Sequence, residues 1–532
     1  NDTSGTNSNG GGNRNLFFSC DGKVTINGQS SILALINLRS NRRNGVSYGA
    51  QFTNTENGEI NIIGDRAIGI YLTTNIKGDP IIDLENPINL KGNDQKGIII
   101  NNVYDLSLSK IKLEIGTTDG TPTSGTVGMY FRYLRYGLNN ATSGGPRPGY
   151  MVLQNYELNL GENTSQSSLI RVDAGRIDIR KTNGGIKVNG KNNFGIIGSG
   201  VTSGSGENGQ IDLKNDITSV GDGNIPIFGE KGAVIKLLKD TDAQETTGRN
   251  IITTGIASHS LIVLPGIGAS LTQIIGTDVD SIITNGNNSI VAYNEKGTIN
   301  ISGTPTSTFN AQYKSLGDKS VVLYNREGTT TFNNKADYEI GTNGTLLYLK
   351  GGTININSNN GISNFTVGEG SLFSSVDKTA GGRVNFTSTN EGDFKLKLKT
   401  GANGFMIDSG NVSMTDTGLK TYLNSYYSGL NNIDVNLERD SNLFILKNYG
   451  KIKLSDVINI GASGGIFNSV SGNGKNAFLW NGSLELDKAG TQGQLGIINL
   501  DDENDNYYKL GKLNSSIKVE SDVTIEGSGG DQ

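Results

Sequence analysis

The sequence is poor in the residue types on which many catalytic and metal sites depend. Its 532 residues include one histidine, one cysteine and one tryptophan, and proline occurs only 8 times. The single cysteine, Cys20, excludes a disulfide within the chain, and scarce cysteine is typical of bacterial proteins that cross an oxidising periplasm. We expect Cys20 to be a small buried side chain, with a crosslinking thiol as the alternative.

Charge is scarce and nearly balanced. The chain carries 46 basic and 51 acidic residues for a net charge of −5. It therefore lacks the basic field that binds nucleic acid or an anionic membrane surface. No apolar run reaches the roughly 18 residues of a membrane-spanning helix, so we expect no membrane insertion by this segment. The polar ends, without a leader or an outer-membrane barrel, suggest a piece of a longer protein.

Candidate catalytic and metal-binding residues are few. A serine triad needs an imidazole, which only His259 can supply, and Ser409 lies at the turn of a repeated phrase. We expect both to be structural. No Cys/His cluster suits zinc, and the acidic segment Asp501–Asn506 is interpreted as a solvated loop, with calcium as the alternative. The sequence thus predicts no catalytic site and no cofactor, although carboxylate-dependent glycoside cleavage stays open because acids are scattered throughout.

What the chain does contain is a repeated phrase: an apolar run, a polar turn, a glycine, and then two apolar residues separated by one polar residue. It reads SIVAYNEKGTINI at Ser289–Ile301, SVVLYNREGTTTF at Ser320–Phe332 and TLLYLKGGTINI at Thr345–Ile356. Further copies include Gly404–Met414, Leu443–Leu454, Ala477–Leu486 and Ser168–Ile179. The glycines with apolar residues two and four places later are Gly22, Gly58, Gly175, Gly184, Gly209, Gly297, Gly352, Gly382, Gly410, Gly450 and Gly482, with Gly328 a partial copy.

Such self-similarity predicts a solenoid. Short alternating runs indicate strands with one buried face, and mixed turns before the glycines favour a parallel β-helix over an array of tight hairpins. We therefore predict an all-β, right-handed parallel β-helix with loop insertions. Its rod spans 21–515, after a flexible leader or cap at 1–20 and before a polar end at 516–532. Asparagine amides should form ladders between coils, and Tyr293, Tyr324 and Tyr348, each four places before a glycine, should share one environment.

One insertion, 117–150, departs from this rhythm. It interleaves tyrosine and arginine, which are enriched at binding hot spots, and insertions in solenoids often make the binding face. Alternation along it places Tyr130 and Arg132 on one face and Phe131 on the other. A solvent-facing strand beside a capping loop is the alternative interpretation. The candidate ligand-binding residues are Tyr130, Arg132, Tyr133, Arg135, Tyr136, Arg147 and Tyr150, with Tyr422, Tyr426 and Tyr427 as a smaller second group.

The Asn/Gly-rich phrases ending in Gly-Thr-Ile-Asn-Ile resemble the passenger domains of type V autotransporters, most closely the large fusobacterial adhesins. The resemblance is one of pattern and covers roughly 22–500. It implies a non-catalytic, monomeric adhesin at the bacterial cell surface, whose parent is anchored in the outer membrane. The implied partners are a host-cell surface protein or glycan, or another bacterium. The alternatives are a carbohydrate-active enzyme on the same scaffold and a structural stalk that presents a distal tip.

Overall fold

The computed structural model confirms the predicted parallel β-helix. It consists mainly of short strands, and strands of successive coils pair in parallel, as β27 (Ile290–Asn294) does with β30 (Val321–Asn325). An array of hairpins would have paired them antiparallel. The structure describes residues 15–38, 49–74, 81–101, 103, 106–116, 120–132, 149–183, 185–200, 208–268, 270–304, 309–377, 381–408, 416–447, 451–454, 460–461, 464–472, 476–480, 483–486, 506–510 and 516–519.

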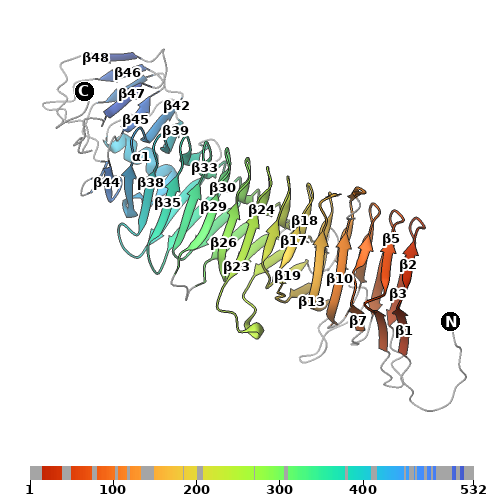
Figure 1. The fold of residues 1–532 in the computed structure, drawn as a ribbon. Coiled ribbons are helices and arrows are strands. Elements are labelled where there is room, and N and C mark those ends of the chain that lie inside the picture. The colour runs from red at the N-terminus through yellow and green to blue at the C-terminus, as the bar shows by residue number, and fades with distance from the viewer. Residues whose placement is uncertain are drawn as a thin grey trace, which may run out of the picture. The chain divides into compact units, whose positions relative to one another are not determined.

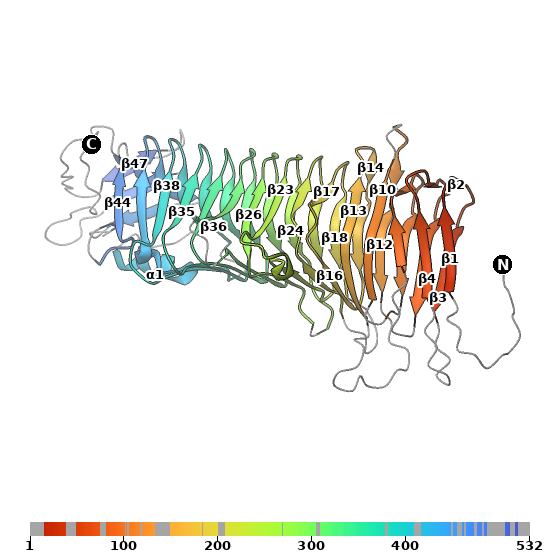
Figure 2. The same ribbon diagram turned by 60° about the horizontal axis from the view of Figure 1, so that its bottom comes forward.

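The chain divides into two compact units. In each unit a coil contributes strands to three sides. Figures 1 and 2 show strands of successive coils side by side. Unit 1 comprises Asn1–Asp216 with Ala233–Ile235. Its first side contains β3 (Ile32–Leu38), β6 (Ile68–Thr74), β9 (Lys96–Asn101), β12 (Val127–Arg132), β15 (Ser168–Val172) and β18 (Phe194–Gly198). Its second side contains β1 (Asn15–Cys20), β4 (Gly49–Asn54), β7 (Ile81–Leu84), the first halves of β10 (Leu106–Ile115) and β13 (Tyr150–Leu160), β16 (Arg176–Ile179) and β19 (Gln210–Leu213). Its third side contains β2 (Lys23–Ile26), β5 (Glu59–Ile62), β8 (Ile88–Leu90), the second halves of β10 and β13, and β17 (Ile186–Val188), while β11 (Thr123–Ser124) pairs with β14 (Thr164–Ser165).

Unit 2 comprises Ile217–Gly232 and Lys236–Gln532 and repeats this plan. Its first side contains β21 (Ile225–Gly229), β24 (His259–Val263), β27, β30, β33 (Thr345–Leu349), β36 (Leu372–Val376), β39 (Asn403–Asp408), β42 (Asn442–Lys447), β45 (Asn476–Trp480) and β47 (Asn506–Leu510). Its second side contains β25 (Gln273–Gly276), β28 (Thr298–Ser302), β31 (Thr329–Asn333), β34 (Thr353–Ser358), β37 (Arg383–Ser388) and β40 (Tyr427–Ser428), and a separate sheet contains β43 (Lys451–Leu454), β46 (Ser483–Leu486) and β48 (Ser516–Val519). Its third side contains β20 (Ile217–Ser219), β23 (Arg249–Thr253), β26 (Val279–Thr284), β29 (Ala311–Ser315), β32 (Ala336–Ile340), β35 (Ser363–Val367), β38 (Phe394–Leu398), β41 (Ile433–Leu437) and β44 (Ser469–Gly472). The remaining strand, β22 (Val234–Leu237), is divided between the units.

Where their side chains are described, the apolar residues after most anchor glycines are buried in the core, as predicted. Ile299 pairs in register with Thr330, and Thr330 pairs with Ile354. All three are buried, and so is the parallel column that contains Ile301 and Phe332. The predicted core positions Val412 and Met414 lie outside the described residues, and the side chains of β43 and β46 are not described. Cys20 is buried, as expected, and its thiol lies 3.0 Å from the carbonyl oxygen of Gly22.

The anchor glycines are needed mainly because adjacent coils approach closely at the corner. A Cβ on Gly328 would lie 2.4 Å from the carbonyl oxygen of Gly297, closer than real contacts allow. The predicted reason, a bend that a Cβ resists, applies where φ is positive, as at Gly352 (φ +69°). Buried asparagines form hydrogen bonds to the backbone at the corner. The Nδ2 of Asn325 donates to Gly328 O at 2.7 Å and to Gly351 O, one coil further on, at 2.8 Å.

Side-chain ladders also follow the outside of the coils in unit 2. Tyr293, Tyr324 and Tyr348 share one half-buried environment, with successive ring centroids 5.0 and 4.9 Å apart in edge-to-face contact. This confirms the predicted equivalence of the three tyrosines. The predicted amide ladders occur as well, because Asn333 donates to Asn300 and Asn357 donates to Asn333, both at 2.8 Å.

One α-helix interrupts the coils, although the sequence shows no long helical period. The helix α1 (Asp416–Tyr426) packs beside β37 and β40 and buries Leu419 and Leu423, which are one helical turn apart. Two buried leucines in 11 residues are too short a signal to stand out against the repeats. The described chain also contains the 3₁₀ turns η1 (Thr241–Ala243) and η3 (Leu430–Asn432), and none of its helices is long and apolar enough to cross a membrane.

Candidate functional site

The Tyr/Arg insertion is described at its two ends. In β12 the side chain of Phe131 is buried, whereas Tyr130 is half-buried and Arg132 exposed, which confirms the predicted alternation. Tyr150 begins β13 on a different side of the coil. Four of the predicted ligand-binding residues lie outside the described residues: Tyr133, Arg135, Tyr136 and Arg147.

The described tyrosines of this group are held by charged neighbours. The hydroxyl of Tyr130 donates to Asp173 Oδ2 at 2.5 Å, and Arg171 Nε donates to Asp173 Oδ1 at 2.8 Å. Burial, with the hydrogen bond to this carboxylate, raises the pKa of Tyr130 to about 12. The guanidinium of Arg176 lies over the Tyr150 ring at 5.7 Å. Both tyrosines are therefore parts of the unit 1 surface, and Arg132 is the exposed member of the described set.

The other predicted candidates are buried or half-buried where they are described. His259 lies in β24, and burial lowers its pKa, so the ring is neutral at pH 7. Its buried Nδ1 has no hydrogen-bond partner among the described residues. Tyr427 is buried and its hydroxyl lies 3.0 Å from Ser374 Oγ, while Tyr422 and Tyr426 are half-buried on α1. Ser409 lies outside the described residues.

A pocket that the sequence did not reveal lies on the third side of unit 2. It has a volume of about 290 Å³ and is lined by residues of β26 and β29 and by described residues that precede β29 and β32. Phe309 stands at its rim with 80% of its side chain exposed. The other lining residues are mostly amides and hydroxyls: Asn250, Asp280, Ser281, Gly303, Thr304, Asn310, Ala311, Gln312, Asn334, Lys335 and Asn360.

Asp337 fixes the orientation of two of these amides. Its Oδ1 accepts from Asn310 Nδ2 at 2.7 Å, and its Oδ2 accepts from Gln312 Nε2 at 2.8 Å. Burial acts to raise the pKa of Asp337, but hydrogen bonds from Asn364, Asn310 and Gln312 outweigh it and lower that pKa. An ionised carboxylate only accepts, so both NH₂ groups must face Asp337. The carbonyl oxygens of Asn310 and Gln312 accept no hydrogen bond from the described part of the chain.

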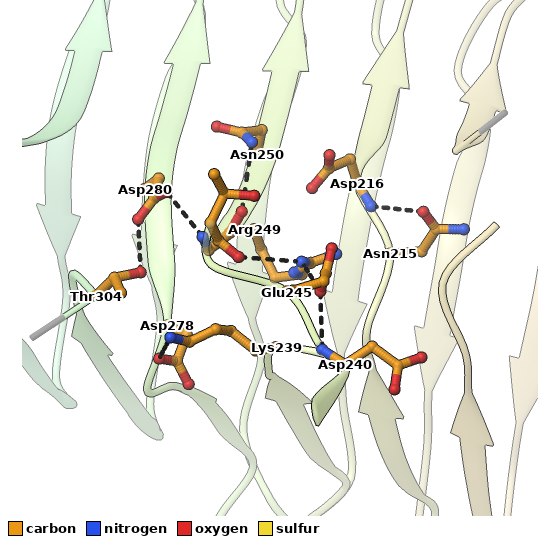
Figure 3. Close-up of polar contacts among 12 residues, drawn as sticks. Asn215, Asp216, Lys239, Asp240, Glu245, Arg249, Asn250, Asp278, Asp280 and Thr304 are labelled. Carbon is orange, nitrogen blue, oxygen red and sulfur yellow. Dashed lines mark hydrogen bonds and ion pairs between the residues drawn. The ribbon is translucent and has the colours of Figure 1, made fainter. Parts of the chain in front are cut away.

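The opposite wall of the pocket is tied to an inserted loop between β22 and β23. Asp280 accepts from Thr304 Oγ1 at 2.6 Å and from the backbone amide of Gly248 at 2.7 Å (Figure 3). The adjacent Asn250 accepts from Ser281 Oγ at 2.6 Å. These contacts connect the loop end to β26 and to the turn after β28, so this wall is preformed.

A buried ion pair anchors the same loop. The guanidinium of Arg249 contacts Glu245 Oε2, and their side chains are only 1% and 5% exposed. The same carboxylate oxygen accepts from the backbone amide of Asp240 at 2.8 Å, so Glu245 closes the loop on itself (Figure 3). At the loop base, Lys239 lies 3.6 Å from Asp278. An ion pair this deep is costly unless its charges are hydrogen-bonded, and Glu245 Oε2 accepts from both Arg249 and the Asp240 amide.

The spacing of the repeats contained a partial signal for this pocket. Gly297 and Gly328 are 31 residues apart, whereas Gly328 and Gly352 are 24 apart, so the first interval contains an insertion. That insertion carries Thr304 and Phe309. The pocket itself needs side chains from successive coils, and sequence spacing does not show which of them meet. Among the described residues, no group of three His, Cys, Asp or Glu side chains is arranged to hold a metal ion.

Comparison with protein-family models, curated proteins and solved structures finds no match to this chain.

Proposed function

We propose that this chain is a non-catalytic adhesin segment, of the autotransporter passenger type, that binds ligands at a bacterial cell surface. The partners we propose are a host-cell surface protein or glycan, or another bacterium, with the chain acting as a monomer. The parallel β-helix supports this proposal because its repeated coils leave insertions free to differ on one side.

The pocket beside Phe309 is the observation that carries the proposal. Phe309 is 80% exposed, and aromatic residues are enriched in the core of binding interfaces relative to the rest of the surface. Here it stands beside hydrogen-bonding side chains that Asp280 and Asp337 hold in place. This combination of an apolar surface with a few fixed polar groups is that of a small recognition site.

The test is binding of labelled protein to epithelial cells and to other bacteria. We expect Phe309→Ala to weaken binding about tenfold, because truncation of a binding-site aromatic costs more than about 1 kcal/mol. Leu271→Ala is the matched control, since Leu271 is 54% exposed and does not line the pocket. Equal binding by both variants would exclude the pocket as the site of cell binding. No binding by the unmodified protein would exclude the adhesin proposal.

The Tyr/Arg insertion remains a second proposed binding region. Arg132 is exposed at the end of β12, and Tyr133 and Arg135 follow it in the sequence. The buried side chains of β12, Met129 and Phe131, are left in place when these three residues are changed to alanine. Unchanged cell binding by the folded triple variant would remove the insertion from the proposal.

A carbohydrate-active enzyme is the second candidate function, and one carboxylate pair favours it. Burial raises the pKa of Glu114, and the neighbouring charge of Glu157 acts in the same direction against the hydrogen bond from Asn159. Asn159 Nδ2 lies 3.4 Å from a carboxylate oxygen of each. A raised carboxyl pKa beside a second carboxylate suits acid–base cleavage of glycosides. Glycan hydrolysis that Glu114→Gln abolishes would establish the enzyme instead of the adhesin.

A further inference from the structure

We infer that the pocket beside Phe309 binds a neutral saccharide, through one aromatic stacking surface and a set of hydrogen-bond acceptors. The inference rests on the proposed binding function and assigns a ligand class to its site. It follows from the orientation of the amides, the charge of the pocket and its size.

The acceptor set comes from Asp337. Because Asn310 and Gln312 direct their NH₂ groups to this carboxylate, their carbonyl oxygens are the amide atoms left to meet a ligand. A ligand for these atoms must donate hydrogen bonds. Hydroxyl groups do so, and a sugar carries several of them around one ring.

The stacking surface is Phe309. Its exposed ring can cover the apolar C–H face of a pyranose, while the hydroxyls at the ring edge reach polar side chains. Asn334 and Asn360 provide further amides at the pocket border, where Asn334 Nδ2 donates to Gly303 O at 3.0 Å. The volume of about 290 Å³ is at the lower end for ligand pockets, which suits one or two sugar rings.

Charge selects against acidic sugars. Asp280 lines the pocket, and the ionised Asp337 lies directly behind two of its amides. Lys335 is the one basic residue in the described lining, and no arginine is present there to form the two-pronged contact that carboxylates favour. Sialic or uronic acids would bring a further negative charge to this site, and like charges lower affinity.

The experiment is a titration of the full chain with neutral monosaccharides and disaccharides, followed by ligand-observed NMR and calorimetry. We expect binding of at least one neutral sugar, at least tenfold weaker binding of its uronic-acid counterpart, and an about tenfold loss in Phe309→Ala. Leu271→Ala should bind like the unmodified protein. Asp337→Asn removes a negative charge and allows the amides of Asn310 and Gln312 to rotate. It should therefore weaken binding of the neutral sugar and reduce the difference in affinity between that sugar and its uronic-acid counterpart.

The outcomes separate this inference from the proposed function. Cell binding that depends on Phe309, without binding of any sugar, would overturn the saccharide assignment and keep the adhesin. Saccharide binding without cell binding would keep the assignment and overturn the adhesin. Preference for the acidic sugar, or equal sugar binding by Phe309→Ala, would also overturn the inference.

Discussion

Several buried polar side chains in this protein are hydrogen-bonded or ion-paired to one another. The Arg249–Glu245 pair is an example at the loop beside the pocket, because both charges are almost fully removed from water. Surface ion pairs such as Lys296–Glu327, with both side chains more than half exposed, are screened by solvent. The two kinds of pair should therefore respond differently to the same substitution.

Glu245→Gln is expected to lower the free energy of unfolding by about 3–5 kcal/mol, because it removes the carboxylate charge that contacts the buried Arg249 guanidinium. Glu327→Gln is the control and should cost less than about 1 kcal/mol. Urea unfolding followed by circular dichroism measures both variants. Equal, small effects would show that the loop is not anchored by this ion pair.

Asp337 should make stability depend on pH. Its folded pKa is lowered, with its amide hydrogen bonds outweighing the effect of burial. A lowered carboxyl pKa stabilises the folded state above the unfolded pKa of about 4, and this contribution is lost as pH falls through the folded pKa. Asp337→Asn should therefore be less stable than the unmodified protein at pH 7, by about 1–2 kcal/mol.

The stability difference between Asp337→Asn and the unmodified protein should shrink as pH is lowered from 5 to about 3. Unfolding midpoints in urea across this range provide the measurement. A difference that stays constant with pH would mean that the charge of Asp337 contributes nothing and that only packing is lost.

At the scale of single elements, the sequence predicted the strands well because each carries its own signal. The glycine and the two apolar residues after it identify β28 and β34 and also their register, since a one-residue slip would expose both apolar side chains. Helix α1 was missed because its burial involves only Leu419 and Leu423. The pocket was missed because its amides are oriented by Asp337, a contact that no short motif encodes.

A corner glycine should tolerate substitution only where no neighbouring coil approaches it. Gly328→Ala places a Cβ 2.4 Å from a backbone carbonyl oxygen, so the backbone must shift and the coil should lose stability, by about 1–3 kcal/mol. Gly22 is the matched control, because a Cβ there meets nothing within 4 Å and its φ is not positive. Thermal unfolding of the two variants compares them, and equal melting curves would contradict the role of close approach at the corner.

At the scale of the whole molecule, each unit is a stack in which a coil contacts mainly the coils beside it. The aromatic core of unit 2 illustrates this: Tyr338 packs on Phe365 of the next coil at 4.9 Å and on Tyr313 of the preceding one at 5.5 Å between ring centroids. The stability of such a stack is approximately the sum of the stability of each coil and the interaction free energies between neighbouring coils. A destabilising substitution in one coil should therefore affect mainly the coils beside it.

Tyr338→Ala tests whether destabilisation of one coil is limited to its neighbours. Tyr338 is 1% exposed, and its removal leaves a cavity that should cost about 3–5 kcal/mol. Hydrogen exchange followed by mass spectrometry should show faster exchange in β29, β32 and β35, with little change in β5 and β8 of unit 1. Thr366→Ala, at a half-buried outward position of β35, is the control and should leave exchange unchanged. Uniformly faster exchange in both units would mean that the whole chain unfolds as one cooperative block, in which case the nearest-neighbour description fails.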